Sequence, residues 1–363
     1  MKVLITTDNT GAAWTFSINL AKGLISNGID VALAIMGDPL TDDQKTEVSF
    51  VSYYNFNCKQ EWMADPWDDV KKAGKWLLTL KHQIQPDIVH LNSYSFGALP
   101  WNIPVVITAH TCRLSWWKAV KGVEAPTDWD TYKEYVSKGI QAADVIAATS
   151  NTMLNDIEEL YEPIKKKVVI YNGGDSSRFN VEEKENYIFS ICRLWDEAKN
   201  IKLVIKAASK ISYPIYIAGD IADYDVPDLP HNVHLLGRLS RAEVVGWLSK
   251  AAVYLLPVIY EPFGYTFIEA AFSGCALVTG NIESMREIWE DNALYVDTNN
   301  SDELAYSVNM VMWDVHRRQL LARNAKKHAM SNYIHNKMTS EYLFIYQSLS
   351  EAFSVNNLKL QER

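Results

Sequence analysis

Short apolar runs recur along the whole chain, and segments with helical periodicity separate most of them. The first run is Lys2 to Thr6; a turn containing glycine, a helical pattern and a second run at 31–35 follow. Strand, turn, helix and strand in this order form the βαβ unit of a parallel sheet. Such strands are buried on both faces, so they read as continuous apolar runs. The pattern therefore predicts an α/β fold.

The runs form two series, which predicts two domains. The expected strands lie at 2–6, 31–35, 87–91, 105–108, 145–149 and 168–171, and then at 187–191, 214–218, 233–236, 253–256 and 276–279. Between the series, the glycine pair of Asn172 to Asp175 is interpreted as a hinge, because glycine tolerates unusual backbone angles. A length of 363 residues also favours two domains. Two doubly wound halves facing each other would place a ligand cleft between them.

The composition of the chain argues against several classes of function. The net charge of −9 disfavours nucleic acid as a partner, because an acidic chain gains little from counterion release. The four cysteines form no CxxC pair, which argues against a zinc or redox site. The N-terminus is too short and polar for a signal peptide, and no apolar run is long enough to span a bilayer. We expect a soluble, cytoplasmic protein, with peripheral contact at the inner face of the membrane left open.

The stretch 260–274 reads YEPFGYTFIEAAFSG and follows a predicted strand. A helix starting near Tyr265 would present unpaired amides and a partial positive charge, which bind phosphate readily. Gly264 would let the backbone approach a ligand closely. Glu261 before the turn and Glu269 one helical turn further are then placed for a sugar and for a diol such as ribose. Two glutamates at this separation alone would indicate only surface acids; the Pro-Phe-Gly corner and the small-residue ending favour a nucleotide-sugar site.

This stretch resembles the donor-site signature of the family 4 glycosyltransferases (glycosyl transferase group 1), which are retaining enzymes of the GT-B fold. The resemblance implies an N-terminal acceptor-binding Rossmann-like domain at 1–175, completed by a returning helix at 345–363. It also implies a C-terminal donor-binding domain at 176–344. The amides expected to cradle the phosphate or sugar belong to Phe263, Gly264, Tyr265 and Thr266, of which the last two stand at positions that vary in the family.

The stretch SICRLWDEAKN at 190–200 resembles the family's Gly-Arg-Leu segment with its later lysine. The resemblance implies that Arg193 and Lys199 stabilise the departing diphosphate. Cys192 replaces the usual glycine, and Lys199 comes one residue later than in the commonest spacing. The alternative is a lysine at a helix start that pairs with a neighbouring acid, Asp196 or Glu197.

Three further segments resemble the family. In TDNTGAAWTF, Gly11 stands for the first glycine of an N-terminal loop that would bring amides to the diphosphate. His110, just past a predicted strand, would face the donor sugar; a structural histidine is the alternative. The strand-end loop expected to line the nucleobase pocket contains Gly237, Arg238 and Leu239.

Two features remain ambiguous. Asp128-Trp129-Asp130 and Asp223-Tyr224-Asp225 match a metal-binding pattern of another glycosyltransferase fold, but an acid-rich chain produces such matches by chance, so no metal or other cofactor is expected. Eight of the twelve tryptophans precede residue 130, and the segment after His110 is rich in them. They are compatible with an acceptor wall, a membrane contact or ordinary packing.

The resemblance implies a retaining glycosyltransferase that moves a hexose from a UDP- or GDP-sugar to a glycan or lipid-linked acceptor, in bacterial polysaccharide or exopolysaccharide biosynthesis. Its expected catalytic residues are Glu261, Arg193, Lys199 and His110, with no metal. Two alternatives stay open: a GT-B-like nucleotide-sugar epimerase that needs no acceptor, and a non-catalytic protein that binds sugar nucleotides.

Overall fold

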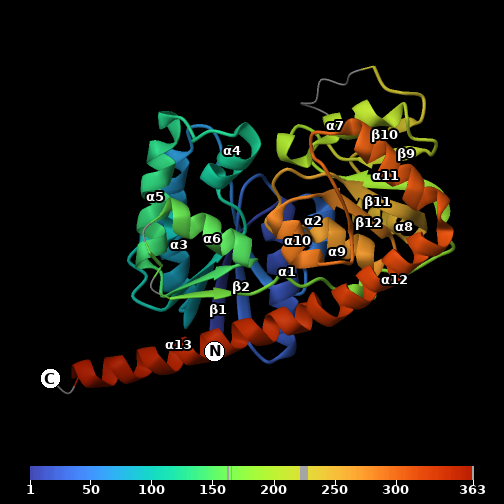
Figure 1. The fold of residues 1–363 in the computed structure, drawn as a ribbon. Helices are drawn as coiled ribbons and strands as arrows, with labels where there is room; N and C mark the ends of the chain where they lie inside the picture. Colours follow the sequence, from blue (N-terminus) through green and yellow to red (C-terminus); the bar gives the residue numbers. More distant parts are fainter. Residues whose placement is uncertain (162, 165, 221–227, 362–363) are drawn as a thin grey trace. The chain divides into compact units, whose positions relative to one another are not determined.

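The computed structural model describes residues 1–361 except 162, 165 and 221–227. The chain forms two compact units, each with its own parallel sheet (Figure 1). Unit 1 comprises Met1–Lys118, Val123–Gly173 and His335–Arg363, and unit 2 comprises Ala119–Gly122 and Gly174–Ile334. The chain thus passes from unit 1 to unit 2 at Gly173–Gly174 and returns to unit 1 at His335.

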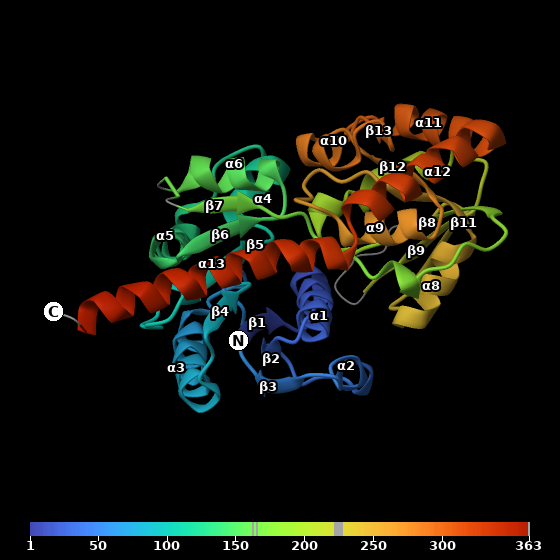
Figure 2. The same cartoon turned by 90° about the horizontal axis from the view of Figure 1, so that it is seen from below.

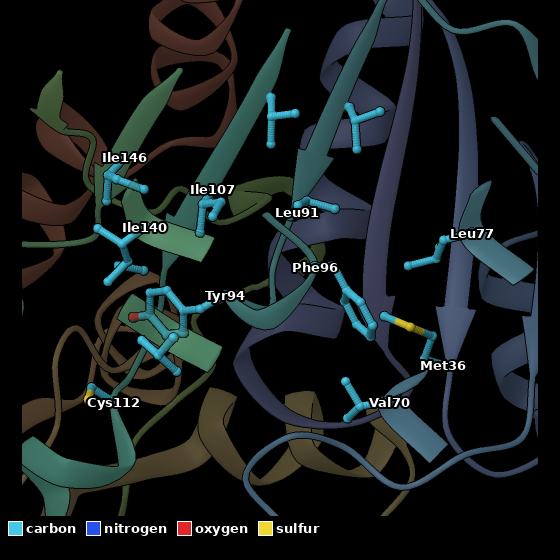
Figure 3. Close-up of a cluster of buried hydrophobic side chains, with 14 of the residues drawn as sticks. Met36, Val70, Leu77, Leu91, Tyr94, Phe96, Ile107, Cys112, Ile140 and Ile146 are labelled. Carbon is cyan, nitrogen blue, oxygen red and sulfur yellow. The ribbon is translucent and has the colours of Figure 1, made fainter. Parts of the chain in front are cut away.

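Unit 1 contains a seven-stranded parallel sheet in the order β3-β2-β1-β4-β5-β6-β7. Its strands are β1 (Lys2–Asp8), β2 (Asp30–Met36), β3 (Ser52–Phe56), β4 (Ile88–Leu91), β5 (Val105–Ala109), β6 (Val145–Ala148) and β7 (Lys167–Val169). Its helices are α1 (Gly11–Ser26), α2 (Asp42–Glu47), α3 (Trp67–Ile84), most of α4 (Arg113–Lys121), α5 (Asp130–Ala142), α6 (Asn151–Leu160) and α13 (His335–Gln361). One face of the sheet is covered by a core that includes Leu91, Phe96, Ile107 and Ile146 (Figure 3).

Helix α13 packs onto unit 1 beside α1 (Figures 1 and 2). Two of its tyrosines reach fully buried polar groups of the sheet. The Tyr342 hydroxyl lies 2.8 Å from Thr108 Oγ1, and the Tyr346 hydroxyl contacts His90 Nδ1. His90 Nε2 in turn lies 2.6 Å from Thr108 Oγ1. Buried polar groups that satisfy one another in this way specify how the helix docks, because any displacement would leave them unpaired.

Unit 2 contains a six-stranded parallel sheet in the order β10-β9-β8-β11-β12-β13. Its strands are β8 (Glu185–Ile191), β9 (Ile215–Ala218), β10 (Val233–Gly237), β11 (Ala251–Leu256), β12 (Ala276–Gly280) and β13 (Leu294–Val296). Its helices are α7 (Ile201–Ala208), α8 (Arg241–Lys250), α9 (Tyr265–Phe272), α10 (Glu283–Trp289), α11 (Ser301–Trp313) and α12 (Val315–Asn332). The order reverses between β8 and β11, and in such sheets ligands bind beyond the carboxyl ends of the strands at this point.

The α/β prediction is confirmed, and each predicted run overlaps a strand. The glycine pair at 173–174 was expected to form a hinge because glycine tolerates unusual backbone angles, and this reason was wrong. Neither Gly173 nor Gly174 has a positive φ. A Cβ on Gly174 would instead lie 2.9 Å from the Phe272 ring, so close packing is what requires glycine there. Within the described residues, no helix has the length and apolar character needed to cross a membrane.

Candidate functional site

The loop after β11, residues 257–264, is held by the Ala198 backbone and the Asn200 side chain of the 193–200 loop. Ile259 donates its amide to the Ala198 carbonyl at 2.8 Å. Asn200, in the left-handed conformation at φ 55°, donates its side-chain amide to the Pro257 carbonyl at 3.1 Å and to Thr298. The two loops that carry the predicted catalytic residues are therefore fixed to each other before any ligand arrives.

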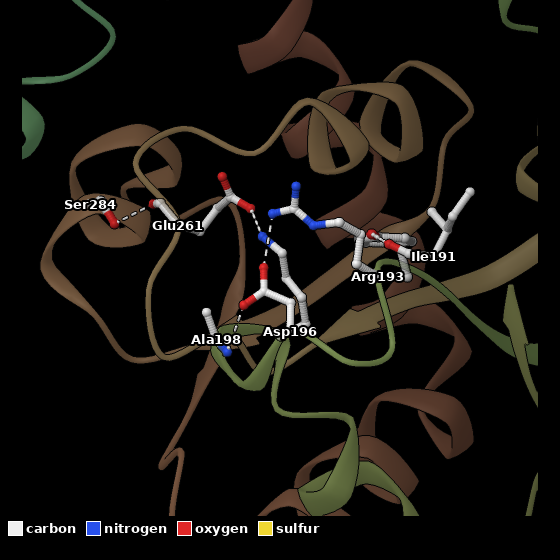
Figure 4. A network of polar contacts seen from close by, with 8 residues as sticks. Ile191, Arg193, Asp196, Ala198, Glu261 and Ser284 are labelled. Carbon is white, nitrogen blue, oxygen red and sulfur yellow. Dashed lines mark hydrogen bonds and ion pairs between the residues drawn. The ribbon is translucent and has the colours of Figure 1, made fainter. Parts of the chain in front are cut away.

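Lys199 lies between these two anchors and contacts Glu261. Its Nζ is 2.6 Å from Glu261 Oε2, and the two side chains are only 14% and 16% exposed. The backbone of Glu261 is also fixed, because Ser284 Oγ donates to its carbonyl at 2.7 Å (Figure 4). The sequence left open that Lys199 pairs with Asp196 or Glu197; the structure pairs it with Glu261, 62 residues further along the chain.

Arg193 lies next to this pair (Figure 4). Its guanidinium donates to Asp196 Oδ2 at 2.9 Å and lies over the Trp195 ring. Asp196 is buried and also accepts from the Ala198 amide, so it holds Arg193 from a fixed position. Half of the Arg193 side chain remains exposed. Two cations and two carboxylates, Glu261 and Asp196, thus lie together at the carboxyl ends of β8 and β11. The cations are suited to a diphosphate and the Glu261 carboxylate to an adjoining sugar.

Gly264 begins α9 with a φ of 87°, which favours glycine strongly. A Cβ at this position would lie 2.8 Å from the Phe267 ring and 3.3 Å from Glu261 Cγ, so it would also disturb the predicted catalytic carboxylate. The first amides of a helix, here those of Tyr265 and Thr266, have no partner within the helix and carry a partial positive charge. The helix start predicted near Tyr265 is confirmed, and phosphate binding at this corner stays a prediction.

Glu269 is the fifth of the eight residues of α9, and its side chain is only 5% exposed. Its Oε1 accepts from Arg241 at 2.6 Å, and the guanidinium of Arg241 lies over the Phe179 ring. Arg241 is the first residue of α8, whose start is fixed by a capping box between Ser240 and Glu243. This partner could not be predicted from the sequence, because it depends on how α8 and α9 pack against each other.

The predicted nucleobase residues follow β10. Gly237 ends this strand with a φ of 68°, and its carbonyl accepts from the Gly219 amide at 2.9 Å. Arg238 and Leu239 continue into the turn before α8. All predicted site residues except Gly11 and His110 therefore belong to unit 2, on loops or helices that follow its strands. They are Arg193, Lys199, Gly237–Leu239, Glu261, Phe263–Thr266 and Glu269.

In unit 1, Gly11 is the first residue of α1 and has a φ of 70°. The loop before it is held by α2, since Gln44 donates its side-chain amide to the Asn9 carbonyl at 2.6 Å. Gln44 also completes the capping box of α2 with Thr41. The glycine loop therefore has a defined conformation, supported from a helix about 30 residues away in sequence.

His110 directly follows β5, as predicted. Its Nε2 lies 2.8 Å from Asn92 Oδ1. The Asn92 amide nitrogen donates to the Thr6 carbonyl and to Ser17, so Oδ1 must be the acceptor and His110 Nε2 the donor. Burial lowers the pKa of His110 to about 3, so the ring is neutral. Its Nδ1 is then a buried acceptor that has no hydrogen-bond partner among the described residues.

The remaining predictions concern metal binding and the tryptophan-rich segment after His110. Asp128-Trp129-Asp130 is described, whereas Asp223-Tyr224-Asp225 lies outside the described residues. Among the residues that the structure describes, no cluster of acids, histidines and cysteines could hold a metal ion. Trp116, Trp117 and Trp129 form a connected cluster of half-buried rings, and Arg113 lies over two of them. Packing accounts for these contacts, while acceptor or membrane contact stays a prediction.

Comparisons with known proteins agree with this geometry. The model of Glycosyltransferase Family 4 matches residues 13–178, and that of Glycosyl transferases group 1 matches residues 175–328. An uncharacterised glycosyltransferase of Methanocaldococcus jannaschii is 26% identical over 92% of this chain and 93% of its own length. The O-antigen chain mannosyltransferase RfbU of Salmonella typhimurium is 31% identical over 44% of this chain and 48% of its own length.

Solved structures share the complete fold. Sucrose-phosphate synthase from Thermosynechococcus elongatus has a TM-score of 0.79 at 15% identity, covering 97% of this chain and 99% of that chain. Anabaena HepE in complex with UDP-glucose has a TM-score of 0.78 at 16% identity, covering 96% and 100%. The two parallel sheets and these structures define the GT-B fold. The chain belongs to the family 4, or group 1, glycosyltransferases, as the sequence motifs indicated.

Proposed function

We propose that the chain is a retaining, metal-independent hexosyltransferase that uses a UDP- or GDP-sugar. The acceptor is a glycan or lipid-linked glycan in bacterial polysaccharide biosynthesis. The observation that carries this proposal is the Lys199–Glu261 pair beside Arg193, at the start of α9. Similar proteins support the substrate class: HepE was solved with UDP-glucose, and RfbU is an O-antigen chain mannosyltransferase.

The proposed reaction breaks the bond between the anomeric carbon and the diphosphate oxygen and forms a bond from the acceptor oxygen to the same carbon. Arg193 and Lys199 stabilise the negative charge that grows on the leaving diphosphate. The amides at the start of α9 bind the same group. The acceptor proton passes to the departing phosphate oxygen, so the protein supplies no separate base and no metal is needed for charge.

Glu261 and His110 position the sugar in this proposal. Once a diphosphate draws Lys199 away, the Glu261 carboxylate accepts hydrogen bonds from sugar hydroxyls and stabilises the cationic ring of the transition state. His110 offers a neutral Nδ1 acceptor, which can receive a hydroxyl hydrogen but cannot donate one. Its role is therefore to orient a hydroxyl and not to act as an acid at neutral pH.

Arg241 is expected to act through Glu269, whose carboxylate we assign to the ribose diol. Arg241→Ala would leave a buried carboxylate without its cation and less well oriented. The KM for the donor should rise about tenfold with a smaller change in kcat, and Arg241→Lys should restore part of the loss. Steady-state kinetics with the natural donor and with its 2′-deoxy analogue measure this.

The matched control for Arg241 is Lys250→Ala at the other end of α8. It removes an exposed ion pair to Glu185 but lies away from Glu269. Wild-type enzyme should prefer the ribose donor, and Arg241→Ala should discriminate less. Equal discrimination in both would contradict the assignment of Glu269 to the ribose.

The proposed function is tested in two steps. A thermal-shift panel of UDP-, GDP- and ADP-sugars identifies the donor, since a ligand at about 100 times its Kd stabilises by about 2.7 kcal/mol. The selected donor is then incubated with and without glycan acceptors, with a chelator present. Nuclear magnetic resonance should show a product of retained anomeric configuration that forms only with acceptor. Epimerised donor without acceptor would favour an epimerase, and binding without turnover would favour a non-catalytic protein.

A further inference from the structure

Helix α12 (Val315–Asn332) is unlike the rest of the chain in charge. Five of its 18 residues are arginine or lysine, and none is aspartate or glutamate. The whole chain, in contrast, carries a net charge of −9. A positive helix on a negative protein concentrates the potential that an anionic partner would meet, while the remainder of the surface repels such a partner.

The cations of α12 are distributed over two sides of the helix. Arg318, Ala325 and Ala329 are buried, and Arg318 donates to the Met312 carbonyl. At 100° per residue, the opposite side is centred on Lys327. That side includes the exposed residues His316, Arg317, Leu320, Arg323, Lys327 and Met330. We call this set the α12 face (helix α12 in Figures 1 and 2).

The cations of the α12 face have no protein counter-ion. Among the described residues, no carboxylate lies within ion-pair distance of Arg317, Arg323 or Lys327. Several exposed lysines elsewhere are paired, for example Lys138 with Glu134 and Lys250 with Glu185. The acid just before the helix, Asp314, accepts from the Arg317 amide as the N-cap. The positive charge of the α12 face is thus available to an external anion.

Apolar side chains lie among these cations. Leu320 and Met330 are 45% and 42% exposed on the α12 face itself. Trp313, the last residue of α11 and two positions before α12, is 74% exposed, and Val315 at the first position of α12 is 48% exposed. A soluble polyanion would use only the cations. The interface of a bilayer binds both kinds of group, because lipid headgroups attract cations and the region beneath accommodates tryptophan and aliphatic side chains.

We propose that the α12 face binds the surface of a bilayer that contains anionic phospholipid. The assignment rests on charge complementarity and on the exposed apolar groups, and it does not depend on the donor, acceptor or mechanism proposed above. Binding is reversible and sensitive to salt, because a few cations and shallow apolar contacts hold the protein without a membrane-spanning segment.

The test is co-sedimentation of the full chain with vesicles of phosphatidylcholine, either pure or with about one third phosphatidylglycerol. Wild-type protein should bind the anionic vesicles and not the neutral ones. The variant Arg317→Gln/Arg323→Gln/Lys327→Gln should bind about 100-fold more weakly. The control Lys45→Gln/Lys138→Gln/Lys250→Gln changes the net charge equally but removes paired lysines, and should bind like wild type. Thermal unfolding checks that each variant is folded.

A second variant distinguishes a bilayer from a soluble polyanion. Leu320→Gln/Met330→Gln keeps every cation and should weaken vesicle binding several-fold without changing retention on a heparin column. Equal vesicle binding by this variant and wild type, with strong heparin retention, would identify a polyanion and overturn the proposal. So would failure of wild type to bind anionic vesicles, or equal losses in the triple variant and its control.

Discussion

Replacing Glu261 with glutamine is expected to lower the rate of glycosyl transfer by about 100- to 1,000-fold while the chain remains folded. Glutamine keeps the shape of the side chain and removes its charge. The lost charge is the one assigned to sugar hydroxyls and to the cationic ring of the transition state. Ser284 holds the backbone of this residue through its carbonyl, so the loop should keep its position in the variant.

The measurement for Glu261 separates binding from chemistry. Transfer is followed with saturating donor, and donor binding is followed by thermal shift, which should persist in Glu261→Gln. Glu290→Gln, an exposed acid of the same unit, serves as the control and should retain full activity. A transfer rate near that of wild type in Glu261→Gln would remove this residue from the catalytic group.

Replacing Lys199 with methionine is expected to lower kcat/KM by about 1,000-fold, because the variant loses a fixed cation beside the leaving diphosphate. Affinity for the free nucleoside diphosphate should fall as well, since that product carries the same charge. The nearby exposed Lys202 provides the control, and Lys202→Met should leave both quantities unchanged. Steady-state kinetics and nucleotide titration measure the two effects.

The Lys199–Glu261 pair can also be tested through the stability of the protein. In Lys199→Met, the little-exposed Glu261 carboxylate loses its counter-ion, so the stability of the protein should fall. Adding Glu261→Gln should restore much of that stability, because the double variant buries no unpaired charge. It should nevertheless stay as inactive as either single variant. Recovery of transfer in the double variant would mean that the two residues only stabilise the fold.

The strands were predictable because both sheets are parallel and buried on both faces, so most strands read as apolar runs. The two that the sequence did not reveal have physical explanations. Strand β3 (Ser52–Phe56) is an exposed edge strand of the sequence SYYNF, without an apolar run. Strand β13 (Leu294–Val296) is an edge strand of only three residues. Neither buries enough side chain to leave a pattern.

The start of helix α9 was predictable because its signals lie in one continuous stretch. A helix start near Tyr265 was expected from residues 260–274, and α9 begins at Tyr265. The partners of the charged residues were not predictable from single segments. Lys199 with Glu261, Glu269 with Arg241 and His110 with Asn92 each join residues from different strands or helices. Such pairs depend on how elements pack, and periodicity carries no information about that.

The docking of α13 has a consequence for synthesis on the ribosome. Nearly all of unit 2 is the continuous segment 174–334, so every strand and helix of that sheet has emerged before translation ends. Unit 1 is synthesised first, but its packing is completed last. Tyr346 can contact His90, and Tyr342 can contact Thr108, only after the final helix has been made. A nascent chain therefore carries a first sheet whose strands are all present but whose polar groups still lack the partners on α13, throughout the production of its second sheet. Chains stopped shortly before residue 342 should be bound by chaperones more than complete ones.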